Sequence, residues 1–198
     1  ECVMDDIYII IMAAGEGTRM KSRLPKVLHR VCGRPIIDYI LDGANAVSKN
    51  LPILVIGHGA DQVVEHIGDK ALYAKQERRL GTGHAVMMAA PYIEGKDGYV
   101  VVLAGDTPLI RGETLNSMIE YTIDGGYSAV ALSAKVDDAT GYGRIIRTPN
   151  GDFDRIVEHK DATEAERTID EINASMYCFR IDSLLSSLDS LSSANAQG

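Results

Sequence analysis

The chain has 198 residues, of which 45% are hydrophobic and 24% charged, and its formal net charge is −8. These proportions are typical of a folded globular protein and argue against a mainly disordered chain. The negative charge argues against a nucleic-acid or membrane-surface protein, because both need a broad positive face. We therefore predict no nucleic-acid partner and no membrane partner, although a local basic site for a small anion remains compatible with this balance.

Cysteine usage and the first apolar run bear on the cellular compartment. The three cysteines include no C-x-x-C pair, which favours neither a disulfide framework nor a zinc site. The run Ile7–Ala14 is too short to span a bilayer, and Asp5 and Asp6 precede it where a signal peptide would carry positive charge. We predict a cytoplasmic location.

Short apolar runs along the chain predict β-strands. Continuous runs of valine, isoleucine, leucine and tyrosine are typical of strands buried on both faces of a mostly parallel sheet. The runs are Ile7–Met12, Pro52–Ile56, Leu72–Ala74, Tyr99–Leu103, Ala129–Ala134 and Met176–Arg180.

Amphipathic stretches between these runs predict helices. They are Pro35–Val47, Ala60–Ile67, His84–Ala90, Gly112–Tyr121 and Ile181–Leu191. Strands that alternate with helices form βαβ units, so we predict a three-layer, Rossmann-like α/β fold with a mixed, mostly parallel sheet. Such folds bind ligands at the carboxyl ends of their strands, and site residues are expected there.

The alternation breaks down between Thr140 and Asn173, where eight of the residues from Asp152 to Glu171 are acidic. We predict a small irregular β excursion with short strands and polar loops in this region. The serine-rich end after Leu191 is expected to be weakly structured. There is no repeat at solenoid spacing, and the length argues for a single domain over residues 1–198.

The loop after the first strand, AAGEGTRMKSRLPK, combines glycines with basic residues. Gly15 and Gly17 can let a phosphate approach the backbone. From Gly17 to Arg34 there are six lysines and arginines and no acidic residue. Because Pro25 interrupts any helix, these cations belong partly to a loop and can converge on one point. A solvated helix face with a glycine turn is the alternative interpretation.

Two other phosphate-binding loops fit the sequence less well. A Walker A loop needs a Gly-Lys-Ser/Thr triplet that does not follow Gly15. A dinucleotide fingerprint needs a third glycine where Met20 stands and an acidic residue at the end of the second strand, whereas Asp38 lies inside a predicted helix. An NAD-dependent oxidoreductase therefore remains only as a minor alternative, which NAD binding would test.

The segment AAGEGTRM followed by LPKVLH resembles the signature of sugar-nucleotide pyrophosphorylases. The segments KQERRLGTGHA, AGDTPLI, TGYGRII, IVEHKDAT and EINA follow in the order and spacing of that family. Together they are similar to the N-terminal uridyltransferase domain of the bacterial bifunctional N-acetylglucosamine-1-phosphate uridyltransferase/glucosamine-1-phosphate acetyltransferase family. The likeness implies a fold of the nucleotide-diphospho-sugar transferase type.

The resemblance also implies a reaction. UTP and N-acetylglucosamine 1-phosphate would give UDP-N-acetylglucosamine and pyrophosphate, for peptidoglycan and lipopolysaccharide in the cell envelope. Charge repulsion is the main obstacle, so cations and positioning should dominate catalysis. By resemblance, Arg19 neutralises the β- and γ-phosphates and Lys26 the α-phosphate, while Asp106 holds Mg²⁺. A polar Gly-Asp-Thr-Pro turn is the alternative interpretation of Asp106.

The same resemblance implies which residues contact the nucleotide. They are Met12, Ala13, Ala14, Gly15, Lys26, Gln76, Gly81, Thr82, Ala104 and Gly105. Among them Gln76 can offer a donor and an acceptor to one edge of the uracil. Thr82 could serve instead as a helix N-cap, and we assign His84 a structural role.

On the sugar side, the resemblance implies contacts to N-acetylglucosamine from Gly141, Glu158 and Asn173. A solvated glutamate is the alternative interpretation of Glu158. Two departures bear on the identity of the sugar. Ala104 stands where the family usually has tyrosine, and Ala174-Ser175 replace the usual Thr-Gly.

The family extends beyond the motifs found here, so we expect this domain to be incomplete at its C-terminal end. An asparagine that supplies a second metal ligand and the acetyltransferase β-helix, through which the full-length form would be a homotrimer, are expected to be absent. Weaker Mg²⁺ binding and an inactive fragment would follow. The open alternatives are another sugar 1-phosphate, dTTP as the donor, or a nucleotide-binding module without catalysis.

Overall fold

The computed structural model describes residues 6–15, 17, 20–78, 80–188 and 190. The chain forms two compact units, which we call unit 1 (Glu1–Val130 and Cys178–Gly198) and unit 2 (Ala131–Tyr177). Within the described ranges, no helix is long and apolar enough to cross a membrane. A single domain over residues 1–198 stays a prediction.

Unit 1 contains most of the regular structure. Its elements are β1 (Ile7–Met12), η2 (Lys26–Leu28), β2 (Arg30–Val31), β3 (Arg34–Pro35), α1 (Ile36–Val47), β4 (Ile53–Ile56), α2 (Ala60–Ile67), η3 (Gly68–Lys70), β5 (Leu72–Lys75), α3 (Thr82–Ala89), η4 (Ala90–Tyr92), β6 (Tyr99–Ala104), α4 (Gly112–Asp124) and α6 (Ile181–Leu188). Strands β7 (Ala129–Lys135) and β10 (Glu171–Arg180) pass between the units.

Four strands of unit 1 form a parallel sheet in the order β5-β4-β1-β6. Met12 at the end of β1 is in register with Val55 of β4 and with Ala104 at the end of β6. On the far side of β4, Ile56 is in register with Lys75. The carboxyl ends of all four strands therefore meet at one edge of the sheet.

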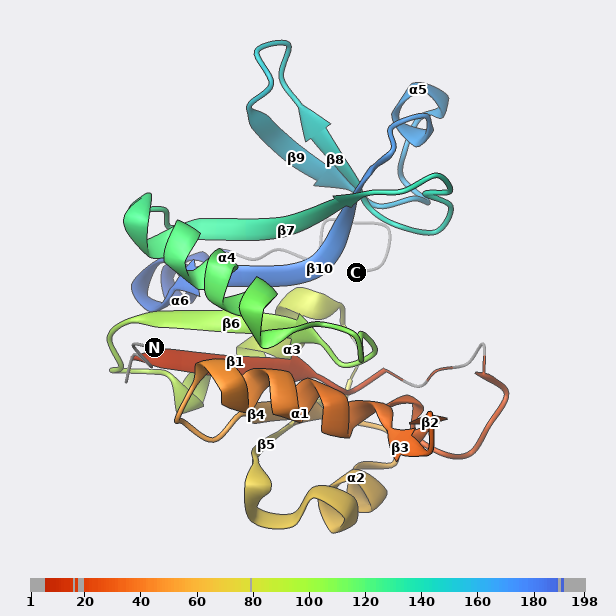
Figure 1. The fold of residues 1–198 in the computed structure, drawn as a ribbon, viewed down its shortest axis with the longest axis vertical. Coiled ribbons are helices and arrows are strands. Elements are labelled where there is room, and N and C mark those ends of the chain that lie inside the picture. Colours follow the sequence, from red (N-terminus) through yellow and green to blue (C-terminus); the bar gives the residue numbers. More distant parts are fainter. Residues whose placement is uncertain (1–5, 16, 18–19, 79, 189, 191–198) are drawn as a thin grey trace. The chain divides into compact units, whose positions relative to one another are not determined.

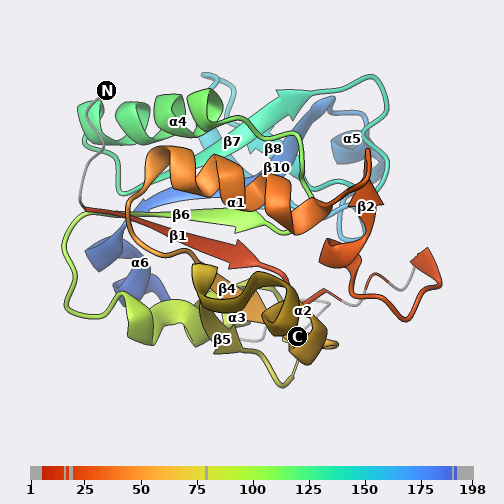
Figure 2. The same cartoon turned by 60° about the horizontal axis from the view of Figure 1, so that its bottom comes forward.

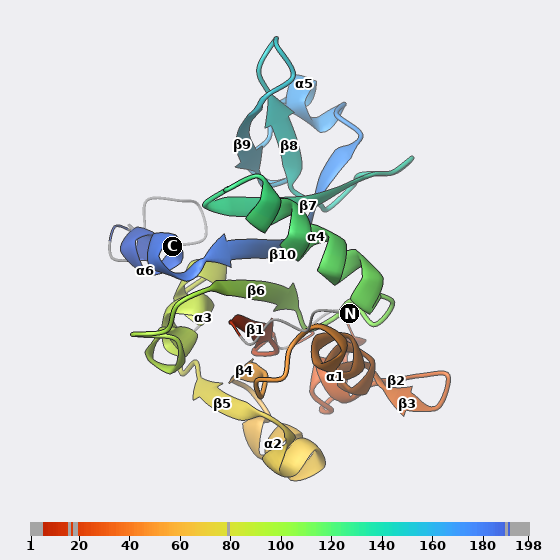
Figure 3. The same ribbon diagram turned by 60° about the vertical axis from the view of Figure 1, so that its left-hand side comes forward.

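The sheet of unit 1 is covered on both faces, which explains the continuous apolar runs. Helices α1 and α4 pack on one face, and α3 and α6 lie on the other (Figures 2 and 3). Ile9, Ile10 and Ile11 of β1 are completely buried, although successive side chains point to opposite faces. Each such side chain contributes roughly 1.5–3 kcal/mol of burial free energy. The predicted three-layer, mostly parallel arrangement is confirmed.

The predicted elements match the observed ones, and the differences lie at their ends. Helix α3 begins two residues before the predicted His84, and α4 continues past the predicted end at Tyr121. Strand β10 begins at Glu171, five residues before the predicted Met176. Polar residues interrupt the apolar pattern of its first half, which pairs antiparallel with β8 through Ile172. The predicted end of α6 at Leu191 lies outside the described residues.

Unit 2 corresponds to the predicted excursion. It contains β8 (Arg144–Arg147), β9 (Phe153–Val157) and the short helix α5 (Glu164–Arg167), together with most of β7 and β10. Figure 1 shows β8 and β9 as an antiparallel pair. Helix α5 begins with a capping box, in which Thr163 and Glu166 bond each other's backbone N–H groups. The antiparallel strands make the sheet mixed, as predicted.

An ion pair links the strands of unit 2. Glu171 of β10 accepts two hydrogen bonds from the Arg147 guanidinium of β8, at 2.7 and 2.8 Å, and one from Ser133 Oγ of β7 at 2.7 Å. The Arg147 hydrogen bond is the main cause that lowers the pKa of Glu171 from its ordinary value of 4.5 to about 2. The carboxylate thus stays ionised in the folded state over a pH range in which it is protonated in the unfolded chain.

A pH dependence of stability follows from this shift. The stabilising contribution of Glu171 is fully present above pH 4.5 and is lost as the pH falls towards 2. We expect Glu171→Gln to lower the free energy of unfolding by about 1–2 kcal/mol at pH 7, a value discounted for solvent screening at the half-exposed Arg147. Urea unfolding of both proteins at pH 7 and pH 3 measures this, and the difference should shrink at pH 3. An equal difference at both pH values would contradict the assignment.

Candidate functional site

The edge of unit 1 at which β1 and β6 end is tightly built. Gly105 N–H donates to the Met12 carbonyl at 3.0 Å, and Ala13 N–H donates to the Val55 carbonyl at 2.8 Å. A Cβ atom on Gly105 would lie 2.5 Å from the Met12 carbonyl oxygen. Only glycine fits this approach, and the chain leaves β6 there with the next residue, Asp106, beside the end of β1.

Asp106 forms an ion pair with Lys26 at this edge. Both side chains are partly exposed, 41% for Asp106 and 27% for Lys26. The partners are 80 residues apart in the sequence, so only the fold brings them together. Here, a cation and a carboxylate lie within reach of solvent at the carboxyl ends of parallel strands, where such folds bind ligands.

Two glycines let the loop around Lys26 fold back on itself. Gly17 has φ of +60°, and a Cβ atom on it would lie 2.9 Å from the Lys26 Cβ. Gly59, before α2, has φ of +69° and lies against Pro25, whose Cγ would be 2.5 Å from an added Cβ. The glycine segment therefore packs against the stem of Lys26, and the neighbouring proline is fixed against the start of α2.

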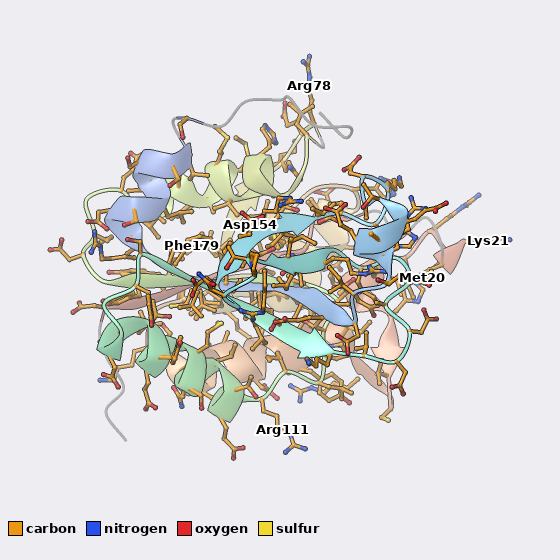
Figure 4. The ribbon with its side chains drawn as sticks, turned by 90° about the horizontal axis from the view of Figure 1, so that it is seen from above. Met20, Lys21, Arg78, Arg111, Asp154 and Phe179 are labelled. Carbon is orange, nitrogen blue, oxygen red and sulfur yellow. The ribbon has the colours of Figure 1, made fainter. Side chains whose placement is uncertain are left out.

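Three other cations of this stretch have partners or positions of their own. Arg34 is paired with Asp42 of α1 at 2.6 Å and lies over the Tyr39 ring. Arg30 donates to the Gly33 carbonyl within the β2–β3 hairpin. Lys21 is exposed and points away from the ribbon (Figure 4). Arg19 lies outside the described residues, so its role stays a prediction.

Asp38 bears on the dinucleotide alternative. The structure places it inside α1, as the sequence predicted, where its carboxylate accepts from His66 Nε2 at 2.8 Å. It is therefore not at the end of a strand, where a ribose-binding carboxylate of a dinucleotide fold stands.

The remaining nucleotide residues continue the same edge towards β5. Gln76 follows β5, donates its backbone N–H to the Ile56 carbonyl at 2.8 Å, and is 5% exposed. A Cβ atom on Gly57 would lie 3.1 Å from the Ala14 Cβ, so the segments after β1 and β4 are in contact. Gln76 is thus joined through the end of β4 to the glycine segment after β1.

Helix α3 begins beside Gln76. Gly81 is its N-cap residue, with φ of +95°, and Thr82 is the first helical residue. The alternative role of Thr82 as the N-cap is therefore wrong, because the left-handed backbone at the cap position suits only the preceding glycine. Gln76 Nε2 lies 3.3 Å from the Gly81 carbonyl oxygen and 3.0 Å from His84 Nδ1.

A magnesium ion was expected at Asp106. Among the described residues there is no group of three His, Cys, Asp or Glu side chains that could hold a metal. Mg²⁺ commonly binds through one or two carboxylates together with waters and substrate phosphates, and does not need a complete protein cage. The single, partly exposed carboxylate of Asp106 fits this mode of binding.

The predicted sugar residues lie in unit 2, around Gly143. Asn173 of β10 donates its backbone N–H to the Gly143 carbonyl at 2.9 Å. A Cβ atom on Gly143 would lie 3.1 Å from a Glu158 carboxylate oxygen. Gly141 is two residues away, exposed, with φ of +86°. The fold therefore brings the three predicted residues together, and the contact to a sugar stays a prediction.

Asn173 is also bonded within its own strand, which the sequence did not indicate. Its Nδ2 donates to Tyr177 Oη at 2.6 Å, and its Oδ1 accepts from the Ser175 backbone N–H at 3.0 Å. Burial is the main cause that raises the pKa of Tyr177. The amide of Asn173 is therefore held in one orientation by residues two and four positions further along β10.

Ser175 has a left-handed backbone, with φ of +56°. This is the position at which the resembling family usually has glycine. We expect Ser175→Gly to raise the free energy of unfolding by about 0.5–1 kcal/mol, because relief of the left-handed strain exceeds the entropy that glycine adds to the unfolded chain. Ser175→Ala keeps the strain and should give no gain. Thermal unfolding of the three proteins decides this, and an equal effect of both substitutions would contradict it.

The fold defines an α/β domain whose parallel strands end at one edge, where Lys26 and Asp106 lie. Residues 9–173 match the family described as the MobA-like NTP transferase domain, and the chain belongs to this family. It is a nucleotidyltransferase domain, as predicted.

Curated relatives agree with this assignment. The chain is 48% identical over 191 residues to the bifunctional protein GlmU of Geobacillus thermodenitrificans, and 45% identical over 195 residues to those of Listeria welshimeri and Bacillus subtilis. These alignments cover 96–98% of this chain but only 42–43% of the relatives. The chain thus spans about two fifths of their length, and the predicted resemblance to one domain of the bifunctional family is confirmed.

A solved structure supports the fold. CMP:2-keto-3-deoxy-manno-octonic acid synthetase complexed with CTP superposes with a TM-score of 0.69 over 96% of this chain and 80% of that one, at 19% sequence identity. At this identity the likeness concerns the fold alone.

Proposed function

We propose that this domain transfers UMP from UTP to N-acetylglucosamine 1-phosphate and releases pyrophosphate, with Mg²⁺ as the cofactor. The observation that carries the proposal is the Lys26–Asp106 pair at the carboxyl ends of β1 and β6. It places a cation beside a potential metal ligand, and nucleotidyl transfer requires both. The relatives of about 45–48% identity support the same class of reaction.

The chemistry is an in-line displacement at phosphorus. A phosphate oxygen of the sugar 1-phosphate forms a bond to the α-phosphorus of UTP, and the bond from that phosphorus to the bridging oxygen breaks. The electron pair leaves with pyrophosphate. Attacking group, reacting centre and leaving group are all anionic, so electrostatic stabilisation and alignment supply most of the rate enhancement.

In this proposal, Lys26 and Asp106 change partners when the substrate binds. The Lys26 ammonium would leave the carboxylate for the α-phosphate, and Asp106 would be the residue that holds Mg²⁺. The metal would neutralise charge on the phosphate oxygens. Since the pair is partly exposed, parting it costs only about 0–1 kcal/mol.

The other predicted residues complete the proposal. Arg19 acts on the β- and γ-phosphates, and the backbone from Met12 to Gly15 borders the nucleoside. The sugar contacts are assigned to unit 2, where Glu158 and Asn173 both lie next to Gly143. Trimerisation, a cytoplasmic location and a role in envelope synthesis concern the full-length protein and belong to the same proposal.

A pyrophosphate-release assay with the full-length protein tests the reaction. We expect release that depends on UTP, N-acetylglucosamine 1-phosphate and Mg²⁺, and a loss of about 10²–10³-fold in Asp106→Asn. Asp97, an exposed residue before the amino end of β6, provides the matched control, and Asp97→Asn should keep the activity. No release from the wild-type protein, or undiminished release from Asp106→Asn, would refute the proposal.

Transfer to another sugar is the second candidate, because Ala104 and Ala174-Ser175 depart from the resembling family at the substrate side. A panel of UTP and dTTP with several sugar 1-phosphates would show it as a preference for a different pair. Binding of UDP-N-acetylglucosamine without turnover would instead indicate a nucleotide-binding module.

A further inference from the structure

We propose that His84 is a positioning residue for base selection: it holds the Gln76 amide so that only Oε1 faces the N3 position of the pyrimidine. The inference rests on the proposed function and specifies how the same site would distinguish uracil from cytosine. It is carried by the hydrogen bonds between Gln76 and the start of α3.

The donor capacity of Gln76 is already used within the protein. A side-chain amide has two N–H donors, both on Nε2. Nε2 lies 3.3 Å from the Gly81 carbonyl oxygen and 3.0 Å from His84 Nδ1. The two N–H groups are therefore directed at two protein acceptors. In the part of the chain that the structure describes, Oε1 takes part in no hydrogen bond.

The two partners also determine the positions of Oε1 and Nε2 in the Gln76 amide. In the reversed orientation Oε1 would face the Gly81 carbonyl, and two acceptors would repel each other. Because an amide nitrogen can only donate, His84 Nδ1 must accept, and the proton of the neutral imidazole is on Nε2. The Gly81 carbonyl thus disfavours the reversed amide, and His84 Nδ1 adds to the same preference by accepting the second N–H.

Rigid elements hold both residues. Gln76 is 5% exposed, and its backbone is bonded to the Ile56 carbonyl at the end of β4. His84 lies in the first turn of α3, which packs on β4 and β1. A buried amide held at both donors has little freedom to turn when a ligand binds.

An amide that presents only its oxygen to the ligand selects for bases of one kind. Uracil carries an N–H group at N3, which donates to Oε1, whereas cytosine carries a lone pair there, which Oε1 repels. The sequence suggested that Gln76 could offer both a donor and an acceptor; in this inference it offers the acceptor, because both described contacts of its amide are made by Nε2. His84, to which the sequence analysis assigned a structural role, is in this inference one of the two acceptors that hold Nε2.

Selectivity between UTP and CTP in the full-length protein tests the inference. Wild-type kcat/KM should favour UTP, and His84→Ala should reduce the UTP-to-CTP ratio by about tenfold, since an amide held only by the Gly81 carbonyl turns more readily and can then accept either base. The change should appear mainly in KM, because the base is remote from the reacting phosphorus. His84→Asn, whose side-chain oxygen can replace Nδ1 as an acceptor, should restore the ratio to within about threefold.

A structural role alone would lower stability without changing the ratio, so an unchanged ratio in a folded His84→Ala would overturn the inference. The tautomer offers a second measurement that needs no variant. In the ¹⁵N NMR spectrum of the wild-type protein at pH 8, Nδ1 of His84 should carry no proton, and a protonated Nδ1 would overturn the inference as well. Absence of any UTP-dependent release by the wild type would refute the proposed function itself, which keeps the two failures apart.

Discussion

Lys26→Ala is expected to reduce kcat/KM for UTP by about 10²–10³-fold, which corresponds to roughly 2.7–4 kcal/mol of transition-state stabilisation. The reason is that the Lys26 ammonium is the described cation of the first loop that lies beside Asp106, where the α-phosphate would react. A steady-state pyrophosphate-release assay of the full-length protein measures the loss. Stability should change by less than about 1 kcal/mol, because the ion pair that disappears is partly exposed.

Lys21→Ala is the matched control for this variant. It removes the same charge from the same loop, but Lys21 is exposed and points away from the ribbon (Figure 4). Its activity should stay within about threefold of wild type, since the charge of an exposed side chain that points into solvent is screened by salt. Equal losses in the two variants would mean that the loop acts through its overall charge, and the specific role of Lys26 would be refuted.

Gly105→Ala is expected to damage both stability and activity. The added Cβ would lie 2.5 Å from the Met12 carbonyl oxygen, which belongs to the backbone and cannot turn aside. The ends of β1 and β6 must then separate, at a cost of about 1–3 kcal/mol in the free energy of unfolding. Because Asp106 is the next residue, its carboxylate moves as well, and a displacement of about 1 Å can cost 10²-fold in rate. Urea unfolding and the pyrophosphate assay measure the two effects.

Gly15→Ala serves as the stability control, because a Cβ atom there meets nothing within 4 Å and the residue does not have positive φ. Its free energy of unfolding should stay within about 0.5 kcal/mol of wild type. If Gly105→Ala were as stable as Gly15→Ala, the close approach of β1 and β6 would not be a constraint on the site.

The fold class could be predicted from the sequence because strands and helices show patterns among neighbouring residues. β1 is recognisable from six consecutive apolar residues, since both faces of this strand are covered by helices and neither face needs polar side chains. The same criterion failed for the first half of β10, where Asn173 and Ser175 interrupt the run. That half pairs antiparallel in unit 2, and its partner is not evident from the residues themselves.

Part of the candidate site could also be predicted from the sequence. The motif order indicated Asp106, Lys26 and Gln76 as ligand residues, because their types and spacing match a known chemistry. The left-handed backbone of Ser175 could also have been inferred from the resemblance, because the family usually has glycine at this position and glycine readily adopts positive φ.

The sequence by itself determined the α/β class of this protein and which residues are expected to contact a nucleotide, because apolar periodicity and motif spacing can be read directly along the chain. Only the tertiary structure decided how those residues act. It paired Lys26 with Asp106 across 80 positions, left the other described cations of the loop on α1, the hairpin or the surface, and directed both donors of Gln76 towards Gly81 and His84. Such pairings depend on which segments pack side by side. Hydrogen bonds between distant segments produce no regular pattern in the sequence, so they could not be predicted from it.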